Sequence, residues 1–202
     1  ENLKEIFKSY FDVPQLNFGL MLMDHQHQRL EKLPVYENIL TSYLLDFWIN
    51  LYDGEMRKMA FQNLKYNPKP VAISDVDNFD EEIKNSPNFE ILTKNNIKSF
   101  MVIPIIHEGE VLALMEFTSE IAGSFNGLKL RKLDSMSDIL IFSLNRFKHE
   151  RENQIEAIIQ REYTSIHQSV LWKFKNEAEK YFNASIQKKL YTLKEISFKN
   201  LS

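Results

Sequence analysis

Residues 99–118 read Ser-Phe-Met-Val-Ile-Pro-Ile-Ile-His-Glu-Gly-Glu-Val-Leu-Ala-Leu-Met-Glu-Phe-Thr, and this stretch decides the fold. Two apolar runs, residues 100–106 and 111–118, flank a polar tetrad that contains Gly109. Apolar runs of strand length on both sides of a short glycine-containing turn are typical of a β-hairpin. The stretch therefore predicts two long antiparallel strands.

Other strand-like and helix-like segments surround this hairpin. Continuous apolar runs predict a buried strand over residues 18–23, with residues 33–35 as its candidate hairpin partner, and a short strand over residues 71–75. The spacing of apolar side chains predicts helices over residues 3–10, 39–52, 55–64 and 89–95. This order of elements predicts an α+β domain, in which a central antiparallel β-sheet is flanked by helices.

From Leu128 onward the apolar period becomes helical. Steps of three and four residues connect Leu133, Met136, Leu140, Leu144, Phe147, Ile155 and Ile158. They predict one long helix, with a polar gap at Arg151 that can interrupt it, followed by an amphipathic helix over residues 169–182. We place a domain boundary at residue 150, between a domain of residues 1–150 and a helical C-terminal extension of residues 151–202 that begins a following region.

The charge balance and hydropathy exclude several partners. The chain carries 25 basic and 28 acidic side chains, a formal net charge of −3. Such a near-neutral chain has no strong electrostatic reason to bind nucleic acid or an anionic membrane. Its apolar runs are of strand length, far short of the ~20 residues that a membrane-spanning helix needs. We therefore expect a soluble, cytoplasmic piece of a larger protein, with neither a nucleic-acid nor a membrane partner.

The chain contains no cysteine. This excludes disulfide bonds, thiolate zinc sites, cysteine nucleophiles and thioether attachment of a cofactor. The motifs of serine hydrolases and zinc proteases, phosphate-binding glycine-rich loops and the dinucleotide fingerprint are also missing from the sequence. We therefore expect a protein without enzymatic activity, and the sequence indicates no particular cofactor.

The hairpin of residues 99–118, together with the order of elements, resembles the GAF domain. GAF hairpins similarly carry a central proline in the first strand, here Pro104, and a glycine-containing turn; Ala113 stands where they usually have glycine. Residues 72–76, Ala-Ile-Ser-Asp-Val, are similar to the Asp-Val tract that follows the family's central strand. The resemblance covers residues 2–149. Hairpins of this composition also occur in PAS-like and other sensory folds.

Residues 155–174 resemble a tract that follows the GAF domain in a family of large bacterial proteins, with Gln168 where proline is expected. This second resemblance adds a bacterial context and no known activity. The GAF resemblance implies a sensory or regulatory domain in signal transduction. One branch of the family reduces free methionine sulfoxide and another attaches bilin, each through cysteine, and the absence of cysteine excludes both chemistries here.

The GAF resemblance also implies a ligand site on one face of the sheet. An apolar pocket with a few polar groups is the usual design of such sites, although packing in the core is the alternative role for each aromatic residue. The candidate ligand-binding residues are Trp48, Asp75, Phe79, Phe89, Phe100, Glu116 and Thr118. The ligand itself cannot be read from these residue types.

Glu116 is a carboxylate inside an apolar strand. Strict alternation places it on one face with Leu112, Leu114 and Thr118, and places Val111, Ala113, Met115 and Phe117 on the other. Both faces are apolar enough to be buried, so the carboxylate needs a partner. We expect an arginine or lysine of a covering helix to pair with it; contact with a ligand is the alternative.

Two polar stretches contain residue types that can bind metal ions, but each is better explained as a solvated turn or loop. His25 and His27 stand beside Asp24, but the surrounding Gln and Arg residues indicate a solvated turn. Residues 75–82 carry five acidic side chains without the glycine and the ligand spacing of a calcium loop, so we expect a solvated acidic loop. We therefore assign no metal ligand.

Two functional hypotheses follow. In the first, a small molecule binds between the sheet and its covering helices, and the terminal helices relay its presence. In the second, the chain is a degenerate GAF scaffold that dimerises or docks partners without a ligand. The near-heptad stripe from Leu133 to Ile158 distinguishes them, because its exposure in a single chain would favour association. We expect a homodimer formed through the terminal helices.

Overall fold

The computed structural model describes residues 3–33, 40, 42–45, 54–162, 171–194 and 196. The chain divides into two compact units, Glu1–Ile141 and Phe142–Ser202. The predicted boundary at residue 150 stays a prediction. Among the described residues, no helix combines the length and the apolar character needed to cross a membrane.

Within the described residues, the first unit contains a five-stranded sheet with the strand order β2-β1-β5-β4-β3. The strands are β1 (Asn17–Asp24), β2 (Arg29–Lys32), β3 (Val71–Ile73), β4 (Ser99–His107) and β5 (Glu110–Ser119). All neighbouring pairs are antiparallel. The predicted hairpin is formed by β4 and β5, and its turn contains Gly109 at a φ of +82°, which glycine adopts without steric cost.

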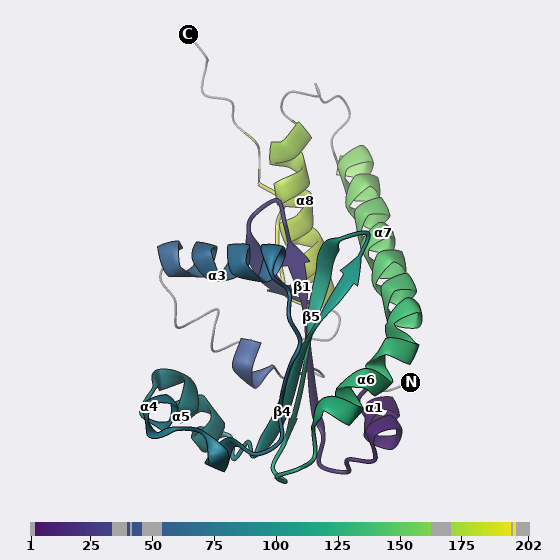
Figure 1. Ribbon diagram of the computed structural model, residues 1–202. Coiled ribbons are helices and arrows are strands. Elements are labelled where there is room, and N and C mark those ends of the chain that lie inside the picture. The colour runs from purple at the N-terminus through teal and green to yellow at the C-terminus, as the bar shows by residue number, and fades with distance from the viewer. Residues whose placement is uncertain are drawn as a thin grey trace. The chain divides into compact units, whose positions relative to one another are not determined.

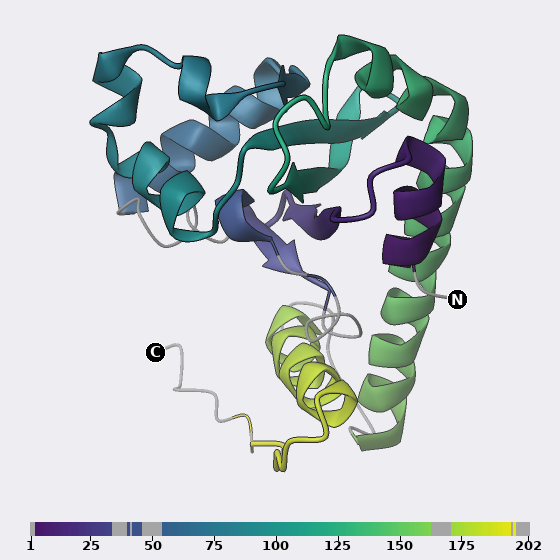
Figure 2. The same ribbon diagram turned by 90° about the horizontal axis from the view of Figure 1, so that it is seen from below.

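Helices cover both faces of this sheet. Figure 1 shows α3 (Gly54–Tyr66), α4 (Glu81–Lys84) and α5 (Pro87–Lys94) on one side, and α1 (Leu3–Phe11) and α6 (Gly127–Lys132) on the other. Figure 2 shows the same two groups of helices from below. The predicted α+β class, an antiparallel sheet with helical cover, is confirmed.

An aromatic cluster fills the face under α1. It consists of Phe7, Phe11, Phe18, Phe117 and Phe125, all at most 1% exposed. The Phe117 ring centroid lies 5.0 Å from that of Phe7 and 5.1 Å from that of Phe11, both in edge-to-face geometry. Phe7 and Phe11 are four residues apart and therefore share one face of α1. Phe117 of the central strand thus fixes α1 to the sheet.

The opposite face carries the second core of this unit. Its buried members are Met21, Met23, Leu44, Leu45, Phe61, Val76, Leu92, Ile97, Val102, Val111 and Leu114. Val111 lies in this cluster, on the same face as Leu114. Strict alternation wrongly placed these two residues on different faces of the sheet. A β-bulge shifts the β4–β5 register between Ile105 and Ile106, and the extra residue changes which side Val111 faces.

Several predicted boundaries shift. The partner of β1 is Arg29–Lys32 rather than residues 33–35, because the turn takes only the four residues 25–28 and includes Gln28 at a φ of +52°. The long C-terminal helix is interrupted at residues 133–136 and not at the predicted polar gap around Arg151: α6 is followed by the 3-10 helix η3 (Leu133–Met136), and α7 (Ser137–Glu162) then runs through Arg151. Of the predicted helix over residues 39–52, residues 43–45 are helical, and most of the remainder lies outside the described residues.

The second unit contains most of α7 and α8 (Leu171–Ile186). The two helices pack through one small core that includes Ile155, Ile158, Ile159, Ala178 and Phe182. Ile155 and Ile158 of the predicted near-heptad stripe are therefore buried by packing within a single chain. Leu133 and Leu144 of the same stripe are also buried.

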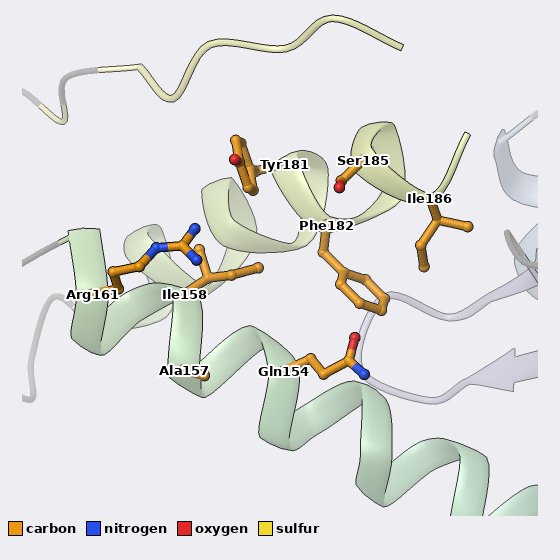
Figure 3. A pocket seen from close by; sticks show the side chains of 8 residues that line it. All are labelled: Gln154, Ala157, Ile158, Arg161, Tyr181, Phe182, Ser185 and Ile186. Carbon is orange, nitrogen blue, oxygen red and sulfur yellow. The ribbon is translucent and has the colours of Figure 1, made fainter. Parts of the chain in front are cut away.

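An open groove of about 540 Å³ runs along this helix pair. It is lined by Gln154, Ala157, Ile158 and Arg161 of α7 and by Tyr181, Phe182, Ser185 and Ile186 of α8. Figure 3 shows Ile158 and Phe182 each reaching toward the opposite helix. The Arg161 guanidinium at its edge is bound to the neighbouring Glu162 carboxylate, with Nε 2.6 Å from Oε1. The floor of the groove is thus an extension of the α7–α8 core.

A buried carboxylate holds the segment that follows α8. Glu177 is 6% exposed and accepts hydrogen bonds from the backbone N–H of Lys194 at 2.9 Å and from the hydroxyl of Tyr191 at 2.8 Å. The Lys180 ammonium lies 3.4 Å from the same carboxylate. Burial raises the pKa of Glu177, but these hydrogen bonds and the Lys180 charge together lower it below the ordinary value of 4.5.

We expect the contact between Glu177 and the following segment to be lost in acid. Because the folded-state pKa of Glu177 is lowered, its stabilising contribution is present above pH 4.5 and disappears as the pH falls through the folded pKa. NMR titration of the Lys194 amide should show its hydrogen bond breaking below that pH. Glu177→Gln should abolish the pH response, and an unchanged response in that variant would contradict the assignment.

Candidate functional site

Strand register places three of the candidate residues on one face of the sheet. Thr118 lies opposite Phe100 of β4, and Glu116 lies opposite Val102 of β4 and Gly19 of β1. Directly opposite residues of antiparallel strands point to the same face of the sheet. Because side chains alternate along a strand, the pair two residues further along points to that face as well. Phe100, Glu116 and Thr118 therefore occupy two adjacent rows of the face covered by α3 and α5. The alternation along residues 111–118 predicts the shared face of Glu116 and Thr118.

Glu116 is completely buried and is bound by main-chain donors. Its Oε1 accepts hydrogen bonds from the backbone N–H groups of Tyr43 at 2.8 Å and Leu44 at 3.2 Å. Its Oε2 accepts from Leu44 at 3.1 Å and from Leu45 at 3.0 Å. Residues 43–45 are helical, and the first N–H groups of a helix have no intrahelical acceptor. The buried carboxylate therefore caps the helical segment that begins at Tyr43.

This arrangement answers the question that the sequence raises about Glu116. Backbone groups of the segment that covers the sheet donate to this carboxylate, and the expected pairing with an arginine or lysine of a covering helix stays a prediction. Hydrogen bonds to an ionised acceptor are shorter and stronger than neutral ones, and the positive end of the helix dipole favours a negative charge at this place.

Gly19 lets the covering segment come this close. A Cβ atom at residue 19 would lie 2.0 Å from Oγ and 2.8 Å from Cα of Ser42, the buried residue that precedes Tyr43. Such distances are far inside van der Waals contact. Because Gly19 lies directly opposite Glu116, the missing side chain and the carboxylate together determine where residues 42–45 contact the sheet.

Phe79, Phe89 and Phe100 are half-buried and pack against the core of the same face. They come from the segment after η2 (Val76–Asn78), from α5 and from β4 respectively. The ring centroids of Phe79 and Phe89 are 6.4 Å apart in an edge-to-face arrangement, a favourable geometry for aromatic pairs. The structure thus brings these three predicted aromatic residues to one core, each with part of its surface uncovered.

Asp75 has a local structural role. Its carboxylate accepts hydrogen bonds from the backbone N–H of Asp77 at 3.0 Å and from the side-chain amide of Asn78 at 3.3 Å, and so caps η2. The Asp-Val tract of the GAF resemblance therefore forms a capped turn directly after β3. Trp48, the remaining candidate, lies outside the described residues.

Hydrogen bonds hold both histidines near the β1–β2 turn. The Nε2–H of His25 donates to the carbonyl of Val111 at 2.7 Å, and Nδ1 of His27 lies 2.7 Å from the Asp24 carboxylate. Partial burial raises the pKa of Asp24, but hydrogen bonds from His27 and the nearby Arg29 charge lower it overall. Across the described parts of the chain, no group of three or more His, Cys, Asp or Glu side chains could hold a metal ion.

Two features of this face could not be predicted from the sequence: the role of Gly19 and the backbone donors of residues 43–45. Gly19 stands within an apolar run, where it indicates nothing more than a strand residue. Tyr43, Leu44 and Leu45 act through their N–H groups, which every residue except proline carries. The one available signal is indirect: a carboxylate predicted to be buried requires donors from somewhere in the fold.

No family model matches this chain, and a search of curated proteins finds no match. Similar solved structures include a domain assigned to a two-component sensor histidine kinase from Sinorhizobium meliloti 1021, which is 16% identical with a TM-score of 0.45. That match covers 75% of this chain and 97% of the other. A GAF domain region of a protein assigned to the membrane of Geobacter sulfurreducens PCA is 18% identical over 71% of this chain and 90% of the other, with a TM-score of 0.41.

A free methionine-R-sulfoxide reductase from Thermoplasma acidophilum is also similar to this chain. It is 17% identical, the match covers 72% of this chain and 89% of that enzyme, and the TM-score is 0.40. The similar structures thus include a GAF domain region, the family that the sequence resembles, together with an enzyme. Likeness at these identities and TM-scores is one of fold, and it assigns neither a ligand nor an activity to this chain.

Proposed function

We propose that this chain is a non-enzymatic, cytoplasmic sensory domain of the GAF type that binds a small molecule over the sheet face described above. The observation that carries the proposal is the half-buried aromatic trio Phe79, Phe89 and Phe100, packed on the core of the same sheet face that carries the buried polar residues Glu116 and Thr118. Small-molecule sites combine apolar and aromatic walls with a few positioned polar groups. The absence of cysteine supports a binding role over sulfoxide reduction through a thiol.

Contacts within the first unit support a route by which ligand occupancy would be relayed. Glu116 and Thr118 face the candidate site, while Phe117 between them packs on Phe7 and Phe11 of α1. The hydroxyl of Tyr10 in α1 donates to the carbonyl of Lys132 at 2.6 Å, at the end of α6. A small movement of β5 would therefore reach α1 and the segment that leads into α7. Such two-state packing changes are how sensory modules commonly respond to ligands.

Native mass spectrometry of the freshly purified domain tests this function. We expect extra mass that survives native conditions and is released on denaturation, and we expect Phe89→Ala to retain less of it, because that ring forms part of the proposed wall. Phe142→Ala, which removes an exposed ring on α7, is the matched control and should retain the same mass as the wild type. Equal retention by Phe89→Ala would place the ligand elsewhere.

The scaffold hypothesis is the second candidate. The stripe from Leu133 to Ile158 gives it little support, because Leu133, Leu144, Ile155 and Ile158 are buried within a single chain, but two other apolar side chains of α7 favour it. Ile139 and Phe142, one turn apart on α7, are 64% and 68% exposed, and neighbouring apolar side chains of this size can mark an association surface. In the same mass-spectrometric experiment, a dimer without bound mass that Phe142→Glu dissociates would favour the scaffold. A monomer without bound mass would remove the support for a dimer formed through the terminal helices.

A further inference from the structure

One face of α7 carries a regular series of exposed side chains, Glu150, Gln154, Ala157 and Arg161. Successive members are three or four residues apart, so they form a single ridge along the helix. The last three line the groove of the second unit, and Figure 3 shows them on successive turns of α7. The side-chain amide of Gln154 donates to the Glu150 carboxylate at 3.0 Å. This α7 ridge therefore has an acidic end at Glu150 and a basic end at Arg161.

The groove beside the α7 ridge has the form that receives a helix. It is open along the helix pair, and its floor contains Ile158 and Phe182, each 8% exposed. Ala157 of α7 and Ser185 of α8 are small residues among those that line it. Helices pack by placing a ridge of one into a groove of the other, and the side chains at the contact set how closely the two axes approach.

The charges of the α7 ridge fit a second α7 that runs in the opposite direction. With a two-fold axis between residues 155 and 156, Glu150 lies opposite Arg161 of the second copy, and Gln154 lies opposite its Ala157. Symmetry makes each of these pairs twice. A parallel arrangement would instead set each charge against its own counterpart, and a shift of one turn would set Arg161 against the exposed Arg146. Like charges placed opposite each other across an interface are unfavourable.

The present contacts of these two charged residues do not prevent such pairing. Arg161 is bound to the neighbouring Glu162, with side chains that are 63% and 35% exposed. The hydrogen bond between Gln154 and Glu150 is also at the surface. Exposed ion pairs contribute at most about 1 kcal/mol, so they can be shared or exchanged when a second charged group approaches.

We propose that this groove is an interface between two copies of the chain, in which α7 of each copy lies antiparallel in the α7–α8 groove of the other. The interface belongs to the second unit and is independent of the proposed ligand site, which belongs to the first. It also differs from the surface of the scaffold hypothesis, because Ile139 and Phe142 precede the paired stretch of residues 150–161.

Charge reversal tests the pairing. Sedimentation velocity should show a dimer of the wild type, and Glu150→Arg or Arg161→Glu should each raise its Kd by about tenfold or more, because each change creates two like-charge contacts. The variant with both changes restores opposite charges and should return to a Kd within about threefold of the wild type. Lys148→Glu and Glu152→Arg are the matched controls, since these exposed residues lie on the opposite side of α7.

Cysteine cross-linking tests the direction of the two helices. The chain has no cysteine of its own, so single cysteines report on one position each. A mixture of Glu150→Cys and Arg161→Cys chains should oxidise to a disulfide-linked dimer, which keeps the second pair of opposite charges. Neither variant alone should cross-link, because equal positions would lie about 16 Å apart along the helices, and a disulfide needs Cα atoms within about 7 Å.

Three results would overturn the proposal. The first is a wild type that stays monomeric at millimolar concentration. The second is a dimer in which mixed cysteine variants fail to cross-link, a result that also decides the case if a charge variant does not fold. The third is a dimer that Phe142→Glu dissociates while both charge variants behave as the wild type, which would assign it to the other surface. Ligand binding by the first unit is tested separately, by the bound mass.

Discussion

Replacing Glu116 with alanine is expected to lower the free energy of unfolding by about 3–5 kcal/mol, the range seen when one partner of a buried charged interaction is removed. The substitution leaves the N–H groups of Tyr43, Leu44 and Leu45 buried without their acceptor. Each unsatisfied buried donor costs about 1–3 kcal/mol, and the collapse of the cavity relieves part of that sum. Urea denaturation followed by circular dichroism measures the change.

The same strand provides the control. Glu110 is an exposed carboxylate at the start of β5, and Glu110→Ala should change stability by no more than about 0.5 kcal/mol, as exposed substitutions usually do. Glu116→Gln should fall between the two, because the amide retains one acceptor oxygen but turns an N–H₂ group toward backbone donors. A loss below about 1 kcal/mol for Glu116→Ala would contradict the capping role.

The hairpin shows how much of this site could be predicted from the sequence. Alternation along residues 111–118 predicts that Glu116 is buried and that it shares a face with Thr118, and both features are present. It does not reveal the donors, because they are main-chain groups 71 to 73 residues away. No residue type marks an N–H group that will meet a carboxylate; only the three-dimensional approach of the covering segment does so.

The aromatic candidates show a different limit. Phe79, Phe89 and Phe100 were all assigned to the sheet face through the GAF resemblance, and strand register places Phe100 there opposite Thr118. All three pack on the same core. Asp75 was selected on the same resemblance, yet its hydrogen bonds cap a turn. A family pattern gives the position of a residue, while the partners of its side chain depend on the local backbone.

Irregularities of the backbone account for the remaining differences. Because of the bulge beside Ile106, Val111 points to the face opposite to the one that strict alternation predicts. The tight turn after β1 allows β2 to begin at the charged Arg29 rather than in the apolar stretch near Leu33. Edge strands tolerate polar residues because one side of the strand faces solvent, so hydrophobicity alone misplaces such a strand.

Gly19→Ala is expected to destabilise the protein by about 3 kcal/mol. The added methyl group would lie 2.8 Å from Cα of Ser42 as well as 2.0 Å from its Oγ, so a change of side-chain rotamer cannot relieve the clash and the backbone must move. Overpacking of this kind costs about 1–3 kcal/mol, and the displaced segment also loses hydrogen bonds to Glu116. Urea denaturation again provides the measurement.

Gly127→Ala is the matched control for this substitution. No atom lies within 4 Å of the Cβ position at residue 127, and the residue begins α6, where alanine is the better helix former by up to about 1 kcal/mol. Gly127→Ala should therefore leave stability unchanged or raise it. If both substitutions behaved alike, the steric explanation for Gly19 would be wrong.

A double-mutant cycle tests whether Gly19 and Glu116, the two residues that position residues 42–45 on the sheet, are energetically coupled. If Gly19→Ala acts by moving residues 42–45 away from the sheet, it already weakens the hydrogen bonds that Glu116→Gln removes. The double variant should then lose less stability than the sum of the single losses, with a coupling of about 1 kcal/mol or more. Strict additivity would mean that Gly19 and Glu116 act on the sheet face independently, and that the approach of Ser42 to β1 does not control how the carboxylate is held.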